Sequence, residues 1–180
     1  MHFAKLALLA ASLGVSIISA APSPEKTEDD FDEIGSLSTD VQRAIERMLV
    51  LGYDAFSVHD LFSTTADLVN GISNMNKANA DVQAEDFDDQ EKTDICRSVH
   101  GTRYTQGSLI KQVGDQAERI SQFPLSPAIG RLLSIYDREM AKFLDEVNSR
   151  LDDCSDAYKQ RLEENIKTAK AQYDAITPKA

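Results

Sequence analysis

The 180-residue sequence contains no tryptophan, five prolines and eight glycines. Proline and glycine form tight turns and interrupt helices, so their scarcity leaves little material for the many turns of an all-β protein. Alternating strand patterns are weak throughout, and the Asn70-Gly71 pair, which often forms a hairpin turn, lies inside a helical pattern. These absences favour an all-α fold.

A long apolar run occurs once, over residues 6–18, after Lys5 and before the small residues 19–21 and Pro22. This order is typical of a secretory signal peptide, and 13 apolar residues fall short of the roughly 20 that a membrane-spanning helix needs. We expect a signal peptide over residues 1–20 and a secreted, extracellular protein. The C-terminal residues are too polar for a transmembrane segment or an anchor signal, which leaves cell-wall association open.

Basic residues are few. Of the 19 lysines and arginines, Lys5 lies in the leader, which leaves 18 against 30 aspartates and glutamates. A protein that grips a nucleic-acid backbone needs clustered positive charge, and an anionic membrane surface attracts basic segments in the same way. We therefore expect no nucleic-acid partner, and the negative charge favours solubility.

Cysteine occurs twice, as Cys96 and Cys154. An even pair in a secreted chain predicts a disulfide, and two buried free thiols are the alternative. A bridge between these positions would stabilise the fold by roughly 3–4 kcal/mol through the loop that it closes.

Residues 21–36 are acidic and contain proline, so we expect a disordered lead-in there. From residue 37 to 177, apolar residues recur at intervals of three and four, as on one face of a helix. The expected helices span about 38–56, 58–79, 91–122, 126–151 and 156–176. Short links between amphipathic helices predict an antiparallel bundle of about five helices, with the one disulfide joining the third helix to the end of the fourth.

Recognisable catalytic motifs are lacking. Outside the leader the histidines are His59 and His100, and neither has a second histidine at metal-binding spacing. The acidic residues 86–91 lack the glycine that a calcium loop places at its sixth position, so we interpret them as a solvated loop. Phosphate-binding loops and nucleophile elbows are also absent. We expect no enzyme, no cofactor and no metal.

The apolar faces are rich in methionine and aromatic residues, including Met140, Phe56 and Phe143. Such faces build an ordinary filled core in most bundles. Methionine and phenylalanine also adapt to acyl chains, so a lipid-sized cavity between the helices is the second interpretation. Periodicity does not decide between the two.

Three tracts carry a resemblance to a known family. They are ADLVNGISNMNKANADV (66–82), LIKQVGDQAERISQFPLSPAIGRLLSIYDREMAKFLDEVNSRL (109–151) and LEENIKTAKAQYDAI (162–176). Over residues 37–176 the chain resembles the fungal hydrophobic surface-binding protein A and cell-wall galactomannoprotein family. The similarity lies in the helical pattern and includes no catalytic motif. The cysteine pair and the absence of a Ser/Thr-rich tail depart from the family pattern.

The resemblance implies a secreted protein that adsorbs to hydrophobic surfaces or holds a fatty acid or other lipid in an apolar cavity between helices, and that recruits secreted hydrolases in some members. We place the apolar ligand between the second, third and fourth helices. The expected lining residues are Leu68, Ile72, Leu109, Val113, Leu133, Tyr136, Met140 and Phe143. The alternative is a secreted effector or cell-wall protein with a filled core that binds protein partners.

Overall fold

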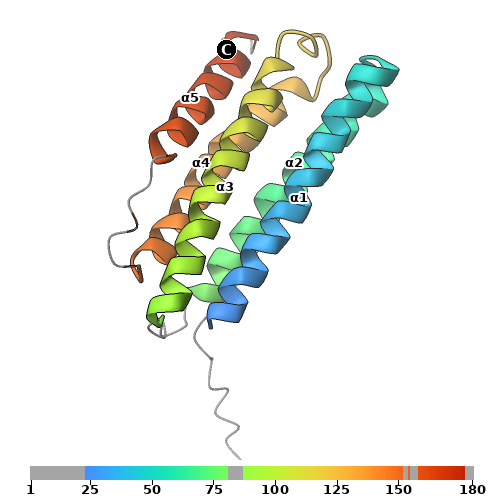
Figure 1. Ribbon diagram of the computed structural model, residues 1–180. Coiled ribbons are helices and arrows are strands. Elements are labelled where there is room, and N and C mark those ends of the chain that lie inside the picture. Colours follow the sequence, from blue (N-terminus) through green and yellow to red (C-terminus); the bar gives the residue numbers. More distant parts are fainter. Residues whose placement is uncertain (1–22, 81–86, 152–153, 155–157, 177–180) are drawn as a thin grey trace, which may run out of the picture.

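Five helices account for most of the chain: α1 (Pro24–Leu51), α2 (Ala55–Asn79), α3 (Asp89–Asp115), α4 (Ser126–Asn148) and α5 (Lys159–Ile176). Successive helices reverse direction, and α1, α3 and α5 lie in front of α2 and α4 (Figure 1). No strand occurs among the described residues. The expected all-α, five-helix bundle is confirmed.

The computed structural model describes residues 23–80, 87–151, 154 and 158–176. The expected signal peptide over residues 1–20 lies outside this range, as do residues 21–22 of the expected lead-in and residues 81–86, 152–153, 155–157 and 177 of the expected bundle. Within the described range, none of the helices combines the length and the apolar character that crossing a membrane requires.

Helix α1 begins at Pro24, where the apolar pattern predicted a start near residue 38. The Ser23 side chain accepts a hydrogen bond from the Lys26 backbone N–H at 3.2 Å, and Pro24 occupies the first helical position, where its lack of an N–H group has no cost. Phe31 and Ile34 are buried in the core. The expectation of a disordered lead-in is therefore wrong from residue 24 onward.

The physical reason for this difference is a buried aspartate. Asp30 is 1% exposed, forms an ion pair with Lys26 one turn earlier, and accepts a hydrogen bond from Asn79 of α2 at 3.1 Å. A polar residue on the inner face interrupts the apolar pattern, and the surrounding acidic residues suggested a solvated segment. The ion pair and the amide together satisfy the carboxylate, so that the helix can pack with it inside.

Helices α2 and α3 both begin with a capping box, in which two side chains bond to the otherwise unpaired N–H groups of the first turn. Asp54 accepts from the Ser57 N–H at 2.7 Å, and this hydrogen bond holds the pKa of Asp54 below its ordinary value. Asp88 and Glu91 form the equivalent pair at the start of α3. Part of the acidic stretch that we interpreted as a loop is therefore a helix cap.

Helix α3 ends at Asp115, earlier than the expected residue 122, and turns lead from there to α4. The helix is continuous through its glycines, and two of them allow α5 to approach closely. A Cβ on Gly114 would lie 2.8 Å from the Ala169 Cα, and one on Gly107 would lie 3.5 Å from the Leu162 Cα. A Cβ on Gly101 would meet nothing within 4 Å.

Each helix packs against two main neighbours, in the circular order α1, α2, α4, α5, α3 and back to α1. Their inner faces form one hydrophobic core. The expected disulfide is confirmed: Cys96, early in α3, is bonded to Cys154, which follows α4, and their Cα atoms are 5.8 Å apart. The bridge fastens the end of the bundle at which α3 begins.

Candidate functional site

The eight residues expected to line a ligand cavity all lie in the single hydrophobic core, and none is more than 5% exposed. All eight are therefore interior residues, as the helical pattern predicts, and the interior is packed. Tyr136, Met140 and Phe143 are completely buried on the inner face of α4. Packing of this kind is what the filled-core interpretation expects.

A chain of hydrogen bonds crosses the middle of this core. The Tyr136 hydroxyl donates to the Gln106 Oε1 at 3.0 Å, the Gln106 amide donates to the Ser38 Oγ at 2.5 Å, and the Ser38 hydroxyl donates to the Ile34 carbonyl at 2.6 Å. Burial, with a smaller contribution from the charge of Asp137, raises the pKa of Tyr136 well above its ordinary value. The phenol stays neutral and acts as a structural donor.

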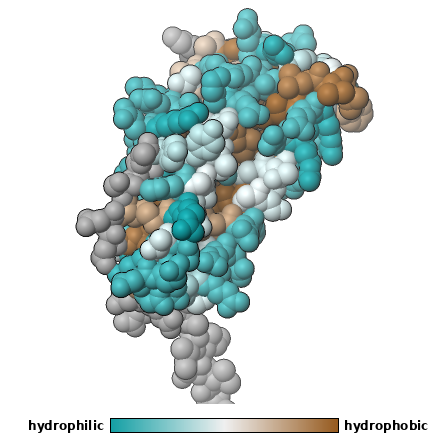
Figure 2. All heavy atoms as spheres, viewed as in Figure 1, coloured by the Kyte–Doolittle hydropathy of each residue, from teal (hydrophilic) through white to brown (hydrophobic). Residues whose placement is uncertain are grey.

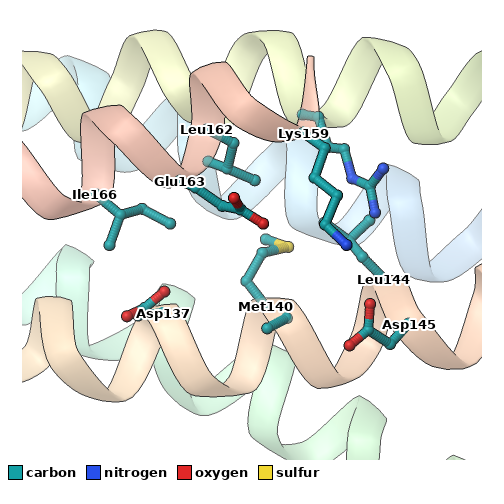
Figure 3. A pocket seen from close by; sticks show the side chains of 10 residues that line it. Asp137, Met140, Leu144, Asp145, Lys159, Leu162, Glu163 and Ile166 are labelled. Atoms are coloured by element: carbon teal, nitrogen blue, oxygen red, sulfur yellow. The ribbon is translucent and has the colours of Figure 1, made fainter. Parts of the chain in front are cut away.

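A pocket of about 90 Å³ opens between α3, α4 and α5. Its apolar floor consists of Met140, Leu144, Leu162 and Ile166. Figure 3 shows Met140 of α4 and Leu162 of α5 pointing into the gap between the two helices. Met140 is the one expected ligand-binding residue that lines this pocket.

Charged groups surround the apolar floor of this pocket. Three carboxylates, from Asp137, Asp145 and Glu163, and two cations, from Arg103 and Lys159, also line it. Arg103 is 2% exposed, and burial lowers its pKa, whereas the charges of Asp145 and Glu163 oppose that shift. The guanidinium remains charged. Lys170 of α5 pairs with Asp137 at 3.0 Å, so the charges around the pocket balance.

An exposed apolar cluster lies on the surface of the bundle. It comprises the last residues of α1 and the second residue of α2, and we call it the apolar tip: Leu49, Val50, Leu51 and Phe56, which are 55%, 81%, 77% and 86% exposed. Figure 2 shows a hydrophobic patch at the upper right, where Figure 1 places the junction of α1 and α2. Phe56 therefore does not belong to the inner faces.

The sequence contained a signal for this tip. Residues 48–51 are four consecutive apolar residues, and a helix turns by a full circle in 3.6 residues. Such a run must point outward somewhere, and Met48 takes the inward place with no exposure. Gly52, with φ at 103°, ends the helix immediately afterwards, which leaves the outward residues at the end of the bundle.

A second feature involves the cysteine pair, which the expected disulfide removes from the possible metal ligands. His100 lies one helical turn after Cys96 on α3, and its Nε2 atom is 3.9 Å from the Cys96 Sγ and 3.7 Å from the Cys154 Sγ. The spacing of four residues between Cys96 and His100 is visible in the sequence. The approach of Cys154 depends on the fold.

The chain was also compared with known proteins. No family model, no curated protein and no solved structure matches it. The resemblance to the hydrophobic surface-binding family therefore stays a prediction from the sequence.

Proposed function

We propose that this protein binds hydrophobic surfaces, and that the apolar tip is the part that makes contact. The observation that carries the proposal is the exposure of Val50, Leu51 and Phe56, each above three quarters, at one end of an otherwise charged bundle. Isolated exposed apolar residues are normal, whereas a contiguous cluster marks an interaction site. An uncharged, extended apolar surface, such as a solid or an oil–water interface, is the occupant that fits a convex tip.

The expected binding energy is sufficient for reversible adsorption. Complete burial of one Val, Leu or Phe side chain contributes about 1.5–3 kcal/mol. Four side chains that are more than half exposed therefore offer on the order of 5 kcal/mol before the cost of immobilising the protein. The bundle itself does not have to open for this contact.

Storage of a fatty acid between the helices has less support. A pocket for a drug-sized ligand has about 300–1,000 Å³, and the pocket beside Met140 has about 90 Å³. Larger hollows of about 440 and 470 Å³ lie along α5, but none of the eight core residues lines them. We therefore place the apolar partner at the tip and not among the eight core residues.

The signal peptide predicted over residues 1–20 agrees with a role outside the cell. An oxidising compartment favours the Cys96–Cys154 disulfide, and natural hydrophobic surfaces are accessible there. The alternative, a secreted protein that binds other proteins through its acidic surface, would use the charged helix faces and not the tip.

A pair of matched variants tests the proposal. In one, Val50 and Leu51 of the tip are both replaced by glutamine; in the control, the exposed Thr168 and Ala171 of α5 are replaced by glutamine. Adsorption to polystyrene beads and to hexadecane droplets is measured at equal protein concentration, with far-UV circular dichroism as the check on folding. We expect the tip variant to bind at least tenfold more weakly than wild type, since two apolar contacts are lost.

The control variant should bind as wild type does. Equal adsorption of the tip variant and the control variant would overturn the proposal. Unchanged adsorption of the tip variant would favour the alternative, a protein that binds partners through its charged helix faces.

A further inference from the structure

Three potential metal ligands from two segments converge at the end of the bundle where α3 begins. Cys96 and His100 lie on one face of α3, since residues four apart on a helix lie above one another. Cys154 comes from the segment between α4 and α5. The two Sγ atoms and one imidazole nitrogen all lie within 4.8 Å of one another, and the three residues are partly exposed. A reductant and an ion could reach them from solution.

We propose that this cluster is a redox-gated zinc site, in which reduction of the Cys96–Cys154 disulfide creates two thiolate ligands that bind Zn²⁺ together with the His100 Nε2. Two thiolates and an imidazole are typical zinc ligands, and three protein ligands leave a fourth position for water. The disulfide form has no thiolate to offer and therefore holds no zinc. The site is independent of the apolar tip.

The chemistry balances with a dithiol as the reductant. The dithiol supplies two electrons and two protons, its own sulfurs join in a disulfide, and the bond between Cys96 and Cys154 breaks to give two thiols. When Zn²⁺ binds, each thiol releases one proton to solvent. The ion then carries two thiolates and one neutral imidazole, so the bound cluster has no net charge, which suits a half-buried position.

The distances fit this ligand set. Zn–S and Zn–N bonds of about 2.3 and 2.0–2.1 Å at tetrahedral angles put a sulfur and a nitrogen ligand about 3.6 Å apart. The His100 Nε2 lies 3.9 Å from one sulfur and 3.7 Å from the other. Two edges of the tetrahedron are therefore in place, and the third forms when the two sulfurs separate after reduction.

The imidazole is the feature that distinguishes this cluster from an ordinary disulfide. A structural disulfide needs no histidine directed at both of its sulfur atoms. The ring of Tyr158 packs edge-on against the His100 ring, with centroids 6.4 Å apart, and holds the imidazole from the side of α5. Orientation of a histidine by its surroundings raises metal affinity, because less freedom is lost on binding.

The experiment is a metal titration of the folded protein under anaerobic conditions, before and after reduction with a dithiol that is then removed. Co²⁺ serves as the optical probe, since tetrahedral thiolate ligation gives visible absorption bands and a thiolate-to-metal charge-transfer band in the near ultraviolet. Zn²⁺ is then added to displace it, and its affinity is measured against a chromophoric chelator. We expect one equivalent of each ion to bind, and only after reduction.

Two single variants separate a built site from adventitious thiol binding. His100→Ala removes the proposed ligand and keeps both cysteines, whereas His59→Ala removes an exposed histidine of α2 and serves as the matched control. The reduced His100→Ala protein should bind Zn²⁺ at least tenfold more weakly than wild type and lose the tetrahedral Co²⁺ bands. The reduced His59→Ala protein should match wild type.

Three binding results would overturn the proposal. They are absence of one-to-one Co²⁺ or Zn²⁺ binding after reduction, equal affinity of the two reduced histidine variants, and equal binding by the oxidised protein. Circular dichroism is recorded throughout. A loss of helix on reduction that zinc does not reverse also counts against the site.

Discussion

Gly114 lies at a close approach of α3 to α5, closer than the one at Gly107. A Cβ at this position would be 2.8 Å from both the Cα and the Cβ of Ala169. Backbone atoms cannot move aside as the end of a flexible side chain can. The small residue is therefore required by the neighbouring helix, although glycine costs a helix interior about 1 kcal/mol relative to alanine.

The substitution Gly114→Ala should lower the free energy of unfolding by about 1–3 kcal/mol, the usual cost of forcing a methyl group into a packed interface. Gly101→Ala is the control, because a Cβ there meets nothing within 4 Å. It should raise stability by up to about 1 kcal/mol through improved helix propensity. Urea unfolding measures both, and stabilisation by both substitutions would show that α3 and α5 are further apart.

At the scale of elements, the first turns of α1 are held by tertiary contacts with α2 and α4. Phe31 packs edge-on against Phe143 of α4, with ring centroids 5.3 Å apart and an interplanar angle of 76°. The same turns contain the buried Asp30 with its amide partner from α2. Acidic composition in a helix is tolerated when its few inward residues have partners of this kind.

Phe31→Ala should lower the free energy of unfolding by about 3 kcal/mol or more, because a buried aromatic ring is replaced by a cavity. Glu33→Ala, on the exposed side of the same helix, should change stability by less than about 0.5 kcal/mol. Thermal unfolding of the two variants gives the comparison. Similar stability of both variants would indicate that residues 24–36 do not pack on the bundle.

Elements whose inner face is continuously apolar could be predicted from the sequence alone. The apolar stripe from Ile129 through Leu133 and Met140 predicts α4, and the pair of cysteines predicts the disulfide. The early part of α1 is not apparent from the pattern because Asp30 lies on its inner face, where the neighbouring Lys26 and Asn79 make its burial acceptable. The apolar pattern of one helix does not show which side chains of another helix will pair with its polar residues.

The candidate sites, too, are partly predictable from the sequence and partly dependent on how the helices pack. The eight expected ligand-binding residues were correctly placed in the interior, but whether an interior is filled or hollow depends on how side chains interdigitate, which periodicity does not record. The apolar tip was visible as the run of residues 48–51. The approach of Cys154 to His100 depends on how α4 ends relative to α3.

For the molecule as a whole, the disulfide is the one covalent link between distant parts of the described chain. It spans a sequence separation of 58 residues and joins the start of α3 to the segment after α4. Most of the stability should nevertheless come from the hydrophobic core, to which all five helices contribute. The bundle should therefore persist without the bridge.

Replacing Cys96 and Cys154 together by serine should lower the free energy of unfolding by roughly 3–4 kcal/mol, the value expected for a loop of this length. The helical circular dichroism signal at 25 °C should be retained. Urea unfolding of the double variant and of oxidised wild type provides the measurement. A variant without helical structure would show that the core is insufficient by itself.

The positions of the tip and the bridge give the molecule two chemically different ends. Helix α1 has 28 residues, which corresponds to about 42 Å of rise, and it runs from the end that holds the sulfur atoms to the apolar end (Figure 1). A monolayer anchored by the tip would stand upright, roughly 40 Å thick. Its outer boundary would present the Cys96–Cys154 disulfide to the medium, so that a coated oil droplet would acquire a redox-responsive exterior without any molecule leaving the film.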